Sequence, residues 1–501
     1  MNFLLKKVFV SRLCAIVAGG LVPFAYAPFN FYFLTVLSLS ILFYLWSGTT
    51  STRESFILGY LFGFAMFGIG ISWVHISINL FGGVNLIGAL VLTCLLVAFI
   101  SLYPALCGYL AIRYFNNFSI IALPALWLFT EWCRGWILTG LPWLNIGTSQ
   151  TDSILASFVP IIGDYGITYI VCLASIAITI LVTGNLQQRL TGGIVLILIS
   201  ISSYLLSDIN WTDENGENIS VTLVQGAIPQ EIKWKPDQRQ KTYAIYSGLS
   251  EPYWMSDLII WPETAIPSLY HLADDFISRL VEQKQNSNAL FMSGLEYEDQ
   301  NSKKYFNSIL LIDNEHRFYH KHHLVPFGEY LPLKSLLGQL LRFLKIPMSN
   351  FSSGDANQKL FETDKGIFGM SICFEDAYGS EIRQSLPEAN ILINVSNDAW
   401  FGDSIAPHQH LQIARMRALE NGRYLLRSTN TGISAVIDNK GKIVSRSPQF
   451  EPHALHENVK LYVGETPYSK YGNKLILSLC FFILLVCFVL QRKTDIAIKI
   501  Q

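Results

Sequence analysis

The sequence predicts a multi-pass α-helical membrane bundle of eight transmembrane helices joined to a layered α/β domain. Three observations support this fold class. Hydrophobic residues make up 51% of the 501 residues and charged residues only 15%, and the mean hydropathy is +0.35, which is unusual for one soluble globule. Residues 1–207 contain only 11 charged side chains, too few to cover a water-facing surface. Residues 208–472 instead alternate short apolar runs with longer polar stretches.

The bundle is predicted from apolar runs that approach the length of a membrane span, about 20 residues. Seven such runs precede residue 208: 8–27, 31–47, 55–78, 84–113, 118–138, 165–183 and 190–206. An eighth run, 473–490, follows the polar region. We therefore expect a helical bundle at 1–207, a separate polar domain at 208–472, and a last transmembrane helix with a cytoplasmic tail at 473–501.

The first apolar run also resembles a signal peptide. Lys6 and Lys7 precede it, and it ends in the small-residue triplet Ala25-Tyr26-Ala27. However, Pro28 directly after the triplet disfavours cleavage, and a second apolar run follows at once. We therefore interpret the first run as a retained transmembrane helix.

The distribution of basic residues predicts the orientation of the bundle, because short cytoplasmic loops are enriched in Lys and Arg. With the N-terminus in the cytoplasm, only Arg134 among the basic residues near the spans falls outside. The basic residues on the cytoplasmic side are then Lys6, Lys7, Arg12, Arg53, Arg113, Arg189, Arg492, Lys493 and Lys499. This topology places residues 208–472 outside the cytoplasm and both termini inside. The net charge of −1 gives no sign of a nucleic-acid partner.

The polar domain shows short β-branched and aliphatic runs separated by helical stretches. The predicted strands are 219–225, 258–261, 289–295, 307–313, 367–373, 390–397 and 433–438. The predicted helices are 237–250, 272–286 and 408–422. Continuous apolar strands interleaved with helices predict a layered α/β domain whose sheets are covered by helices.

The cysteines point to one reactive position. Seven of the eight lie in or at the edge of apolar runs, where cysteine acts as a small hydrophobe: Cys14, Cys94, Cys107, Cys133, Cys172, Cys480 and Cys487. The polar domain contains only Cys373, which therefore has no disulfide partner within that domain. Counting alone leaves two interpretations open, a buried inert thiol or a nucleophile.

Polar motifs follow the predicted strands and favour the nucleophile. Glu263 follows the strand at 258–261, Cys373 closes the strand at 367–373, and Lys321 begins the segment KHHLVPFGE that ends at Glu329. Glu263 can remove the thiol proton, and Lys321 can stabilise a thiolate and an oxyanion. Glu329 can orient the lysine. Taken singly, these residues are also compatible with a helix cap, a surface lysine and a salt-bridge partner.

Four motifs together resemble the nitrilase superfamily, which carries a Glu–Lys–Cys triad on an α-β-β-α sandwich. These motifs are WPETAIP, KHHLVPFGEYLP, SICFEDAYG and INVSNDAWFG. The full pattern is similar to the bacterial apolipoprotein N-acyltransferase family, through APFNF, TEWCRGWILTGLPWLNIG, VQGAIPQEIKW and RMRALENGRYLLRSTNTG. The resemblance covers nearly the whole chain.

The resemblance implies roles for individual residues. Glu263 is expected to be the general base, Lys321 the stabilising cation and Cys373 the acylated nucleophile. Three further residues fall at positions that are functionally important in the family: Trp234, Glu329 and Glu375. One departure is visible, since Phe374 follows the cysteine where a tyrosine is expected.

The resemblance also implies a reaction and a location. A phospholipid such as phosphatidylethanolamine is expected to donate an acyl chain to Cys373 as a thioester. The α-amino group of a diacylglyceryl-cysteine on an apolipoprotein is expected to accept it. No cofactor is required. The expected location is the bacterial inner membrane, with the catalytic domain in the periplasm.

A leucine-rich segment at 333–347 independently suggests contact with lipid. Its leucines follow the spacing of one helical face, and its basic residues lie elsewhere on the helix. Such a helix can lie at a membrane interface, or it can pack on its own domain.

Three competing interpretations remain at this point. The first is a metal site built from His320, His322, His323, His408 and His410; it is disfavoured because Lys321 interrupts the first cluster and no zinc-type spacing occurs. The second is a membrane-tethered amidase in which water resolves the acyl-enzyme. The third is a transporter or lipid-binding scaffold with an inactive nitrilase-like domain. It is disfavoured because the spans 165–183 and 190–206 contain no charged residue, and Arg189 is the only one between them.

Overall fold

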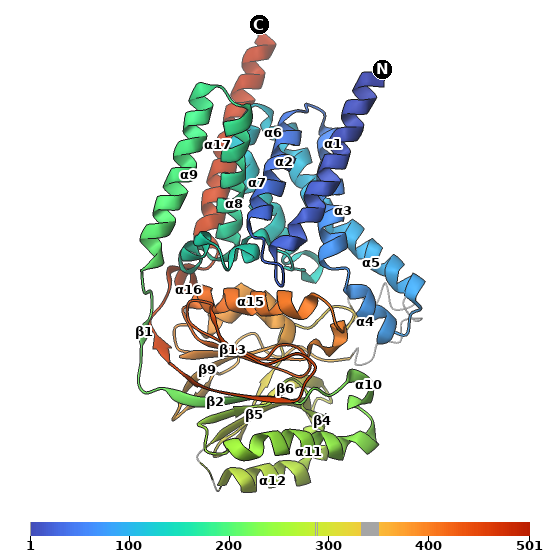
Figure 1. Ribbon diagram of the computed structural model, residues 1–501, viewed down its shortest axis with the longest axis vertical. Coiled ribbons are helices and arrows are strands. Elements are labelled where there is room, and N and C mark those ends of the chain that lie inside the picture. The colour runs from blue at the N-terminus through green and yellow to red at the C-terminus, as the bar shows by residue number, and fades with distance from the viewer. Residues whose placement is uncertain (1, 286, 288, 332–349, 501) are drawn as a thin grey trace. The chain divides into compact units, whose positions relative to one another are not determined.

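Two units of the chain, each packed mainly on itself, make up the computed structural model, which describes residues 2–285, 287, 289–331 and 350–500 (Figure 1). Unit 1 comprises Met1–His75, Ile87–Ile209 and Tyr471–Gln501. Unit 2 comprises Ile76–Leu86 and Asn210–Lys470. The leucine-rich segment 333–347 lies outside the described residues.

Unit 1 is built from apolar helices. Their bounds are α1 (Asn2–Leu21), α2 (Phe33–Ser47), α3 (Thr52–Gly70), α5 (Leu86–Ile100), α6 (Leu102–Phe115), α7 (Ser119–Arg134), α8 (Val159–Thr183), α9 (Leu186–Ser207) and α17 (Lys474–Ile500). Close packing depends on small residues, as in other membrane bundles. A Cβ atom on Gly59 of α3 would lie 2.4 Å from the Pro104 carbonyl oxygen of α6, so only glycine allows this approach.

The number of membrane spans differs from the simple sequence count. Among the described residues, five segments are long and apolar enough to cross a membrane: Val8–Ala25, Leu86–Arg134, Ile154–Thr183, Leu186–Ser207 and Lys474–Ala497. A sixth arises if α3 and the short helix α4 (Val74–Leu80), bent by 55°, form one span. The predicted apolar bundle is therefore confirmed, but the count of eight spans is not.

Two predicted spans are interrupted. The run at 84–113 is divided into α5 and α6 at Ser101. Pro104 explains this break, because proline has no N–H with which to donate to the carbonyl of Ile100. The run at 55–78 bends after Gly70 and continues as α4.

The irregular chain between α7 and α8 is held by a buried polar network within unit 1. Arg134 donates to Asn145 Oδ1 at 2.8 Å and to the Trp143 carbonyl at 2.7 Å. Asn145 in turn donates to Asp164 Oδ2 at 2.8 Å, and Glu131 lies 3.9 Å from Arg134. These buried polar groups satisfy one another, as groups removed from water must.

Unit 2 contains two main β-sheets. The first sheet has the order β14 (His453–Val459), β2 (Ile219–Gln225), β3 (Leu258–Ile260), β5 (Leu290–Glu298), β6 (Tyr305–Ile312) and β7 (His316–His320), with β4 (Ile266–Leu269) also paired to β5. The strands β2, β3 and β5 are parallel neighbours, and β4 also pairs parallel with β5. The strands β14, β6 and β7 pair antiparallel.

The second sheet has a parallel centre. Its order is β13 (Ile443–Arg446), β12 (Ala435–Ile437), β11 (Leu425–Thr429), β10 (Ile391–Ser396), β9 (Gly366–Ile372) and β8 (Phe361–Thr363). Because β9, β10 and β11 are parallel neighbours, the residues that follow them leave the sheet at the same edge.

The two sheets pack face to face, and helices cover their outer faces (Figure 1). Buried aliphatic residues from both sheets, such as Leu223 and Ile393, form the central core. The helices α11 (Arg239–Ser250) and α12 (Asp274–Gln285) pack on the first sheet, and α14 (Gly379–Ile382) and α15 (Ala406–Asn421) pack on the second. The predicted layered α/β domain is thus confirmed as an α-β-β-α sandwich.

The segment Ile76–Leu86 belongs to unit 2, although the chain on both sides of it belongs to unit 1. The ring of Phe81 meets the ring of Trp400 edge to face, with 4.9 Å between the centroids. Trp400 lies in the short helix η11 (Asp398–Phe401), directly after β10.

Candidate active site

Cys373 lies at a sharp turn at the end of β9, where the short helix η9 (Cys373–Ala377) begins. Its backbone φ is +54°, in the left-handed region that a non-glycine residue rarely adopts. Such a conformation costs about 1–3 kcal/mol and persists only where the surroundings stabilise it. The side chain is 8% exposed, so the thiol lies at the margin of the core rather than on an open surface.

Lys321 follows β7 and is buried between two carboxylates. Its Nζ atom donates to Glu329 Oε1 at 2.8 Å and lies 3.8 Å from Glu263 Oε1. Burial alone would lower the lysine pKa, but Glu329 and Glu263 outweigh this effect and raise it well above its ordinary value. Lys321 is therefore a fixed ammonium group.

Glu263 follows β3 and is 6% exposed. Asn307, in β6, donates to Glu263 Oε1 at 2.7 Å and to Glu329 Oε1 at 3.1 Å, which joins the two carboxylates. Among the described residues, the other oxygen, Glu263 Oε2, has no hydrogen-bond partner. One carboxylate oxygen is thus anchored while the other remains available to accept a proton.

A second buried lysine supports the backbone at Glu263. Lys233, at the end of α10 (Gln230–Lys233), donates to the Glu263 carbonyl at 3.1 Å and to the hydroxyl of Thr264. Burial lowers the Lys233 pKa to about 8, against the opposing effect of Glu263 and Glu296. Thr264 has a positive φ of 48°, so this lysine stabilises a strained turn.

The electrostatics couple Cys373 to the same groups. Burial raises the thiol pKa of Cys373, the Glu263 charge raises it further, and Lys321 lowers it. Burial also raises the Glu263 pKa, with Lys321 opposing the shift and Glu329 adding to it. The structure thus brings together a buried thiol, a carboxylate whose proton affinity is raised, and an ammonium. This set can remove a thiol proton and stabilise the resulting negative charge.

Glu375 connects the cysteine turn to the lysine loop. Its Oε2 accepts from the backbone N–H of Ile372 at 2.6 Å, and its Oε1 accepts from the N–H groups of His322 at 2.6 Å and His323 at 3.0 Å. Burial raises the Glu375 pKa to about 7, although Lys321 and these N–H groups oppose the shift. The carboxylate therefore fixes the spacing between two segments that lie about fifty residues apart in sequence.

Two family models match the chain. One, described as the apolipoprotein N-acyltransferase N-terminal domain, matches residues 18–177. The other, described as carbon-nitrogen hydrolase, matches residues 220–467.

Curated relatives match over nearly their full length. An apolipoprotein N-acyltransferase of Methylococcus capsulatus is 40% identical over 493 residues, which is 96% of this chain and 97% of the relative. The Vibrio cholerae protein of the same name is 39% identical, covering 94% of this chain and 96% of the relative. The Haemophilus influenzae protein of that name is 39% identical and covers 97% of each.

The chain belongs to the apolipoprotein N-acyltransferase family.

Family membership confirms the resemblance seen in the sequence and makes the chain an acyltransferase with a nitrilase-type domain and a set of apolar, membrane-type helices. It argues against the transporter and inactive-scaffold interpretation, because that interpretation gives the α/β domain no chemistry.

The other predicted residues differ in their surroundings. Phe374 is 8% exposed and packs edge to face on Tyr378, with 5.3 Å between the centroids. Trp234 follows Lys233 at the end of α10, and its buried indole N–H has no acceptor among the described residues. The histidines of the first cluster bond to different partners. His320 Nδ1 lies 2.8 Å from the Ser308 hydroxyl, and His323 Nδ1 lies 2.8 Å from Glu381 Oε1.

The sequence alone does not identify Asn307 and Lys233 as part of the candidate site. Asn307 lay within a predicted strand, and Lys233 stood beside the more conspicuous Trp234. A usable signal was present in both cases, because a polar side chain within an otherwise apolar strand or turn requires a buried partner.

Proposed function

We propose that this chain transfers an acyl chain from a phospholipid to the N-terminal amine of a diacylglyceryl-cysteine apolipoprotein, through a thioester on Cys373. The names of the relatives support N-acylation of apolipoproteins in general. The observation that carries the proposed mechanism is the position of Lys321, buried between Glu263 and Glu329 and electrostatically coupled to Cys373.

In the first half-reaction, Glu263 takes the thiol proton of Cys373, and the sulfur attacks the ester carbonyl of the phospholipid. The ester C–O bond breaks, and the departing alkoxide takes the proton from Glu263, which releases a lysophospholipid. Lys321 stabilises the oxyanion of the tetrahedral intermediate. Glu329 and Asn307 hold Lys321 and Glu263 in place.

In the second half-reaction, the α-amine of the apolipoprotein attacks the thioester carbonyl. Glu263 takes a proton from the attacking nitrogen. As the C–S bond breaks, Glu263 passes this proton to the Cys373 sulfur. The products are an amide-linked acyl chain and the free thiol. This ping-pong scheme uses the same base and the same cation twice.

We further propose eight membrane spans, within the domain boundaries 1–207, 208–472 and 473–501. The segment Leu86–Arg134 has 49 residues, more than twice the length of about 20 that one span needs. The distribution of basic residues supports cytoplasmic termini and a periplasmic α/β domain in the bacterial inner membrane.

The decisive experiment is mass spectrometry of the purified chain after incubation with a phospholipid whose sn-1 acyl chain is isotopically labelled. We expect the mass of that acyl group on the peptide that contains Cys373, and its loss on addition of a diacylated lipopeptide with a free amine. The label is then expected on the lipopeptide. Label recovered solely as free fatty acid would support the amidase interpretation, and an unmodified Cys373 would overturn the thioester.

A further inference from the structure

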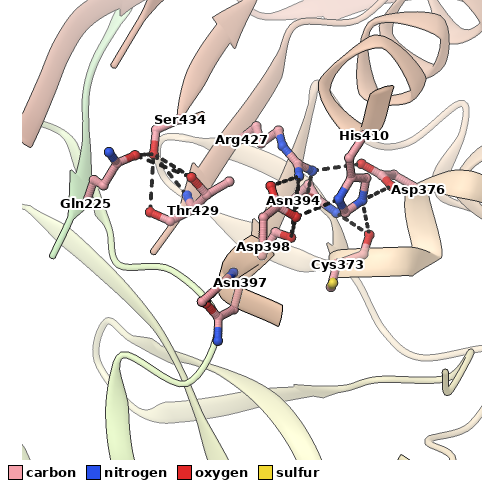
Figure 2. Close-up of polar contacts among 12 residues, drawn as sticks. Gln225, Cys373, Asp376, Asn394, Asn397, Asp398, His410, Arg427, Thr429 and Ser434 are labelled. Atoms are coloured by element: carbon pink, nitrogen blue, oxygen red, sulfur yellow. Dashed lines mark hydrogen bonds and ion pairs between the residues drawn. The ribbon is translucent and has the colours of Figure 1, made fainter. Parts of the chain in front are cut away.

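Four charged side chains of unit 2 form a closed, buried ring beside Cys373 (Figure 2). His410 lies between the two aspartates, with Nε2 2.9 Å from Asp376 Oδ1 and Nδ1 2.8 Å from Asp398 Oδ1. Arg427 closes the ring, because its Nη1 atom lies 3.1 Å from Asp376 Oδ2 and its Nη2 atom lies 3.1 Å from Asp398 Oδ2. All four side chains are at most 1% exposed.

The ring joins four separate elements, since Asp376 comes from η9, Asp398 from η11, His410 from α15 and Arg427 from β11. Burial and Arg427 lower the His410 pKa, but the two aspartates outweigh them and raise it to about 9. For Asp398, Arg427 and His410 outweigh the effect of burial and lower the pKa to about 2. Two carboxylates therefore face an imidazolium and a guanidinium, and the ring has no net charge.

The ring holds the backbone of Cys373. The carbonyl oxygen of Cys373 accepts from Asn394 Nδ2 at 3.3 Å and lies 3.2 Å from His410 Nε2, whose one N–H is shared between this oxygen and Asp376 Oδ1. Asn394 is itself fixed by Arg427, which donates to its Oδ1 at 2.6 Å. In Figure 2 the carbonyl oxygen points toward the ring and the sulfur points away from it.

These contacts explain how a non-glycine residue keeps a left-handed backbone at the cysteine turn. The backbone angles φ and ψ at Cys373 set the direction of its carbonyl group. His410 and Asn394 hold the carbonyl oxygen in that direction through hydrogen bonds. The sulfur is thereby aimed to the opposite side. A substrate does not need to reach the ring for the ring to act.

We propose that His410, Arg427, Asp376 and Asp398 are positioning residues that hold Cys373 in its strained conformation for acyl transfer. The inference rests on the proposed function, since it requires Cys373 to be the acylated nucleophile. It adds a set of residues that act through the cysteine backbone rather than on the substrate.

The test must separate positioning from folding. Removing His410 alone would leave two buried carboxylates opposite one guanidinium, which strongly destabilises a protein. The double variant His410→Leu with Asp398→Asn instead keeps the site neutral, because Asp376 and Arg427 remain as a pair. Asn394→Ala provides a second, uncharged variant that removes the other donor to the same carbonyl.

The measurement is the burst of p-nitrophenol from p-nitrophenyl butyrate with the full chain in detergent, which reports acylation of Cys373 independently of phospholipid recognition. We expect the burst rate at saturating ester to fall about 100-fold in the double variant, the loss typical of a misplaced reacting group. In Asn394→Ala we expect the burst rate to fall about tenfold, the effect of one lost hydrogen bond. The half-saturating ester concentration is expected to stay unchanged, because the ring does not touch the ester.

His408→Leu is the matched control, since His408 lies on the same helix and outside the ring. We expect it to retain the wild-type burst. A folded double variant, or Asn394→Ala, that acylates within about twofold of the wild-type rate would overturn the inference. An equal loss in His408→Leu would overturn it too. If the wild-type chain gave no burst from ester or phospholipid, the proposed function would fall, and this inference with it.

Discussion

At the scale of single residues, the side chains of the candidate site that fix the geometry differ from the side chain that can accept a proton. Glu375 accepts four hydrogen bonds through its two carboxylate oxygens, whereas Glu263 Oε2 has no partner among the described residues. A group saturated with bonds is suited to fixing geometry, and a buried group with a free oxygen is suited to receiving a proton.

The first prediction concerns the nucleophile. Cys373→Ser is expected to abolish the acyl-enzyme, because a serine hydroxyl is far less acidic than a thiol and a carboxylate such as Glu263 is too weak a base to activate it. Mass spectrometry of the incubated variant measures this directly. Cys94→Ser, which changes an exposed cysteine of α5, is the control and is expected to acylate normally. A serine variant with near-normal turnover would contradict the assignment.

The second prediction concerns Lys233. The acylation rate is expected to fall as the pH falls through the Glu263 pKa, since a protonated carboxyl cannot accept the thiol proton. Lys233 lowers that pKa, against the larger effect of burial. Lys233→Met is therefore expected to move the acidic limb of the pH–rate profile to higher pH, whereas the exposed Lys235→Met is expected to leave it in place. An unshifted limb in Lys233→Met would show that the lysine does not act on Glu263.

At the scale of elements, the turn that carries Glu263 depends on a close approach by β5. A Cβ atom on Gly294 would lie 2.4 Å from the Thr264 nitrogen and 2.6 Å from the Glu263 Cα atom. Both neighbours are backbone atoms, which cannot move aside independently. The position of the candidate base is therefore set by the absence of a side chain on the neighbouring strand.

The third prediction follows from this contact. Gly294→Ala is expected to displace the Glu263 turn and to lower the burst rate about 100-fold, as displacements near 1 Å do. Gly248→Ala, in α11, is the matched control because a Cβ there meets nothing within 4 Å. It is expected to keep full activity and to raise the unfolding midpoint slightly, since alanine favours a helix interior. Full activity in Gly294→Ala would show that the turn tolerates the displacement.

The sequence pattern predicted most of the central strands, but it missed one central strand and several outer ones. The runs at 219–225 and 390–397 correspond to β2 and β10, because strands covered on both faces are apolar throughout. The pattern missed β14, an edge strand whose residues are mostly half-buried or exposed, and β11, whose apolar run is interrupted by Arg427. Arg427 is buried only because two aspartates from other elements neutralise it, and no local pattern contains that information.

The same limit applies to the site. The sequence predicts Glu263, Lys321 and Cys373 as candidates because each follows or begins a recognisable motif and Cys373 is the only cysteine between residues 208 and 472. The roles of Asn307 and His410 depend on pairings across the fold, such as the bond between His410 and a carboxylate 34 residues away. The sequence suggests His410 only as a possible metal ligand, whereas in the structure both its ring nitrogens contact carboxylates.

At the scale of the whole molecule, the fourth prediction is the side of the membrane on which Cys373 lies. A membrane-impermeant thiol reagent is expected to label the chain in cells whose outer membrane has been permeabilised. The label is expected to disappear in Cys373→Ser, because the other cysteines lie in or beside apolar helices. Labelling that required cell lysis would reverse the proposed topology.

The fifth prediction concerns the dependence of stability on pH. The folded chain raises the pKa of His410 from its ordinary 6.5 to about 9. Its protonated form therefore stabilises the fold by on the order of 3 kcal/mol below about pH 6.5, and this contribution is lost as the pH rises through about 9. We expect the unfolding midpoint of the wild-type chain to fall over this range.

The comparison that isolates His410 uses the variant His410→Leu with Asp398→Asn, measured by thermal unfolding at a series of pH values. Other groups titrate in both proteins, including Glu375 with a pKa raised to about 7, so the difference between the two curves is the relevant quantity. That difference is expected to shrink between pH 6.5 and 9. A constant difference would mean that His410 is not charged in the folded chain.

The segment Ile76–Leu86, which contains Phe81, has a practical consequence for dividing the protein into fragments. The α/β part is not contiguous in the chain, because Ile76–Leu86 contributes to it from between two hydrophobic helices. A truncation that starts at Asn210 would omit Phe81, and Trp400 would lose this aromatic contact. Trp400 lies in the short helix η11, which also contains Asp398. Chimeras that exchange catalytic parts between relatives must therefore carry two pieces of sequence, not one.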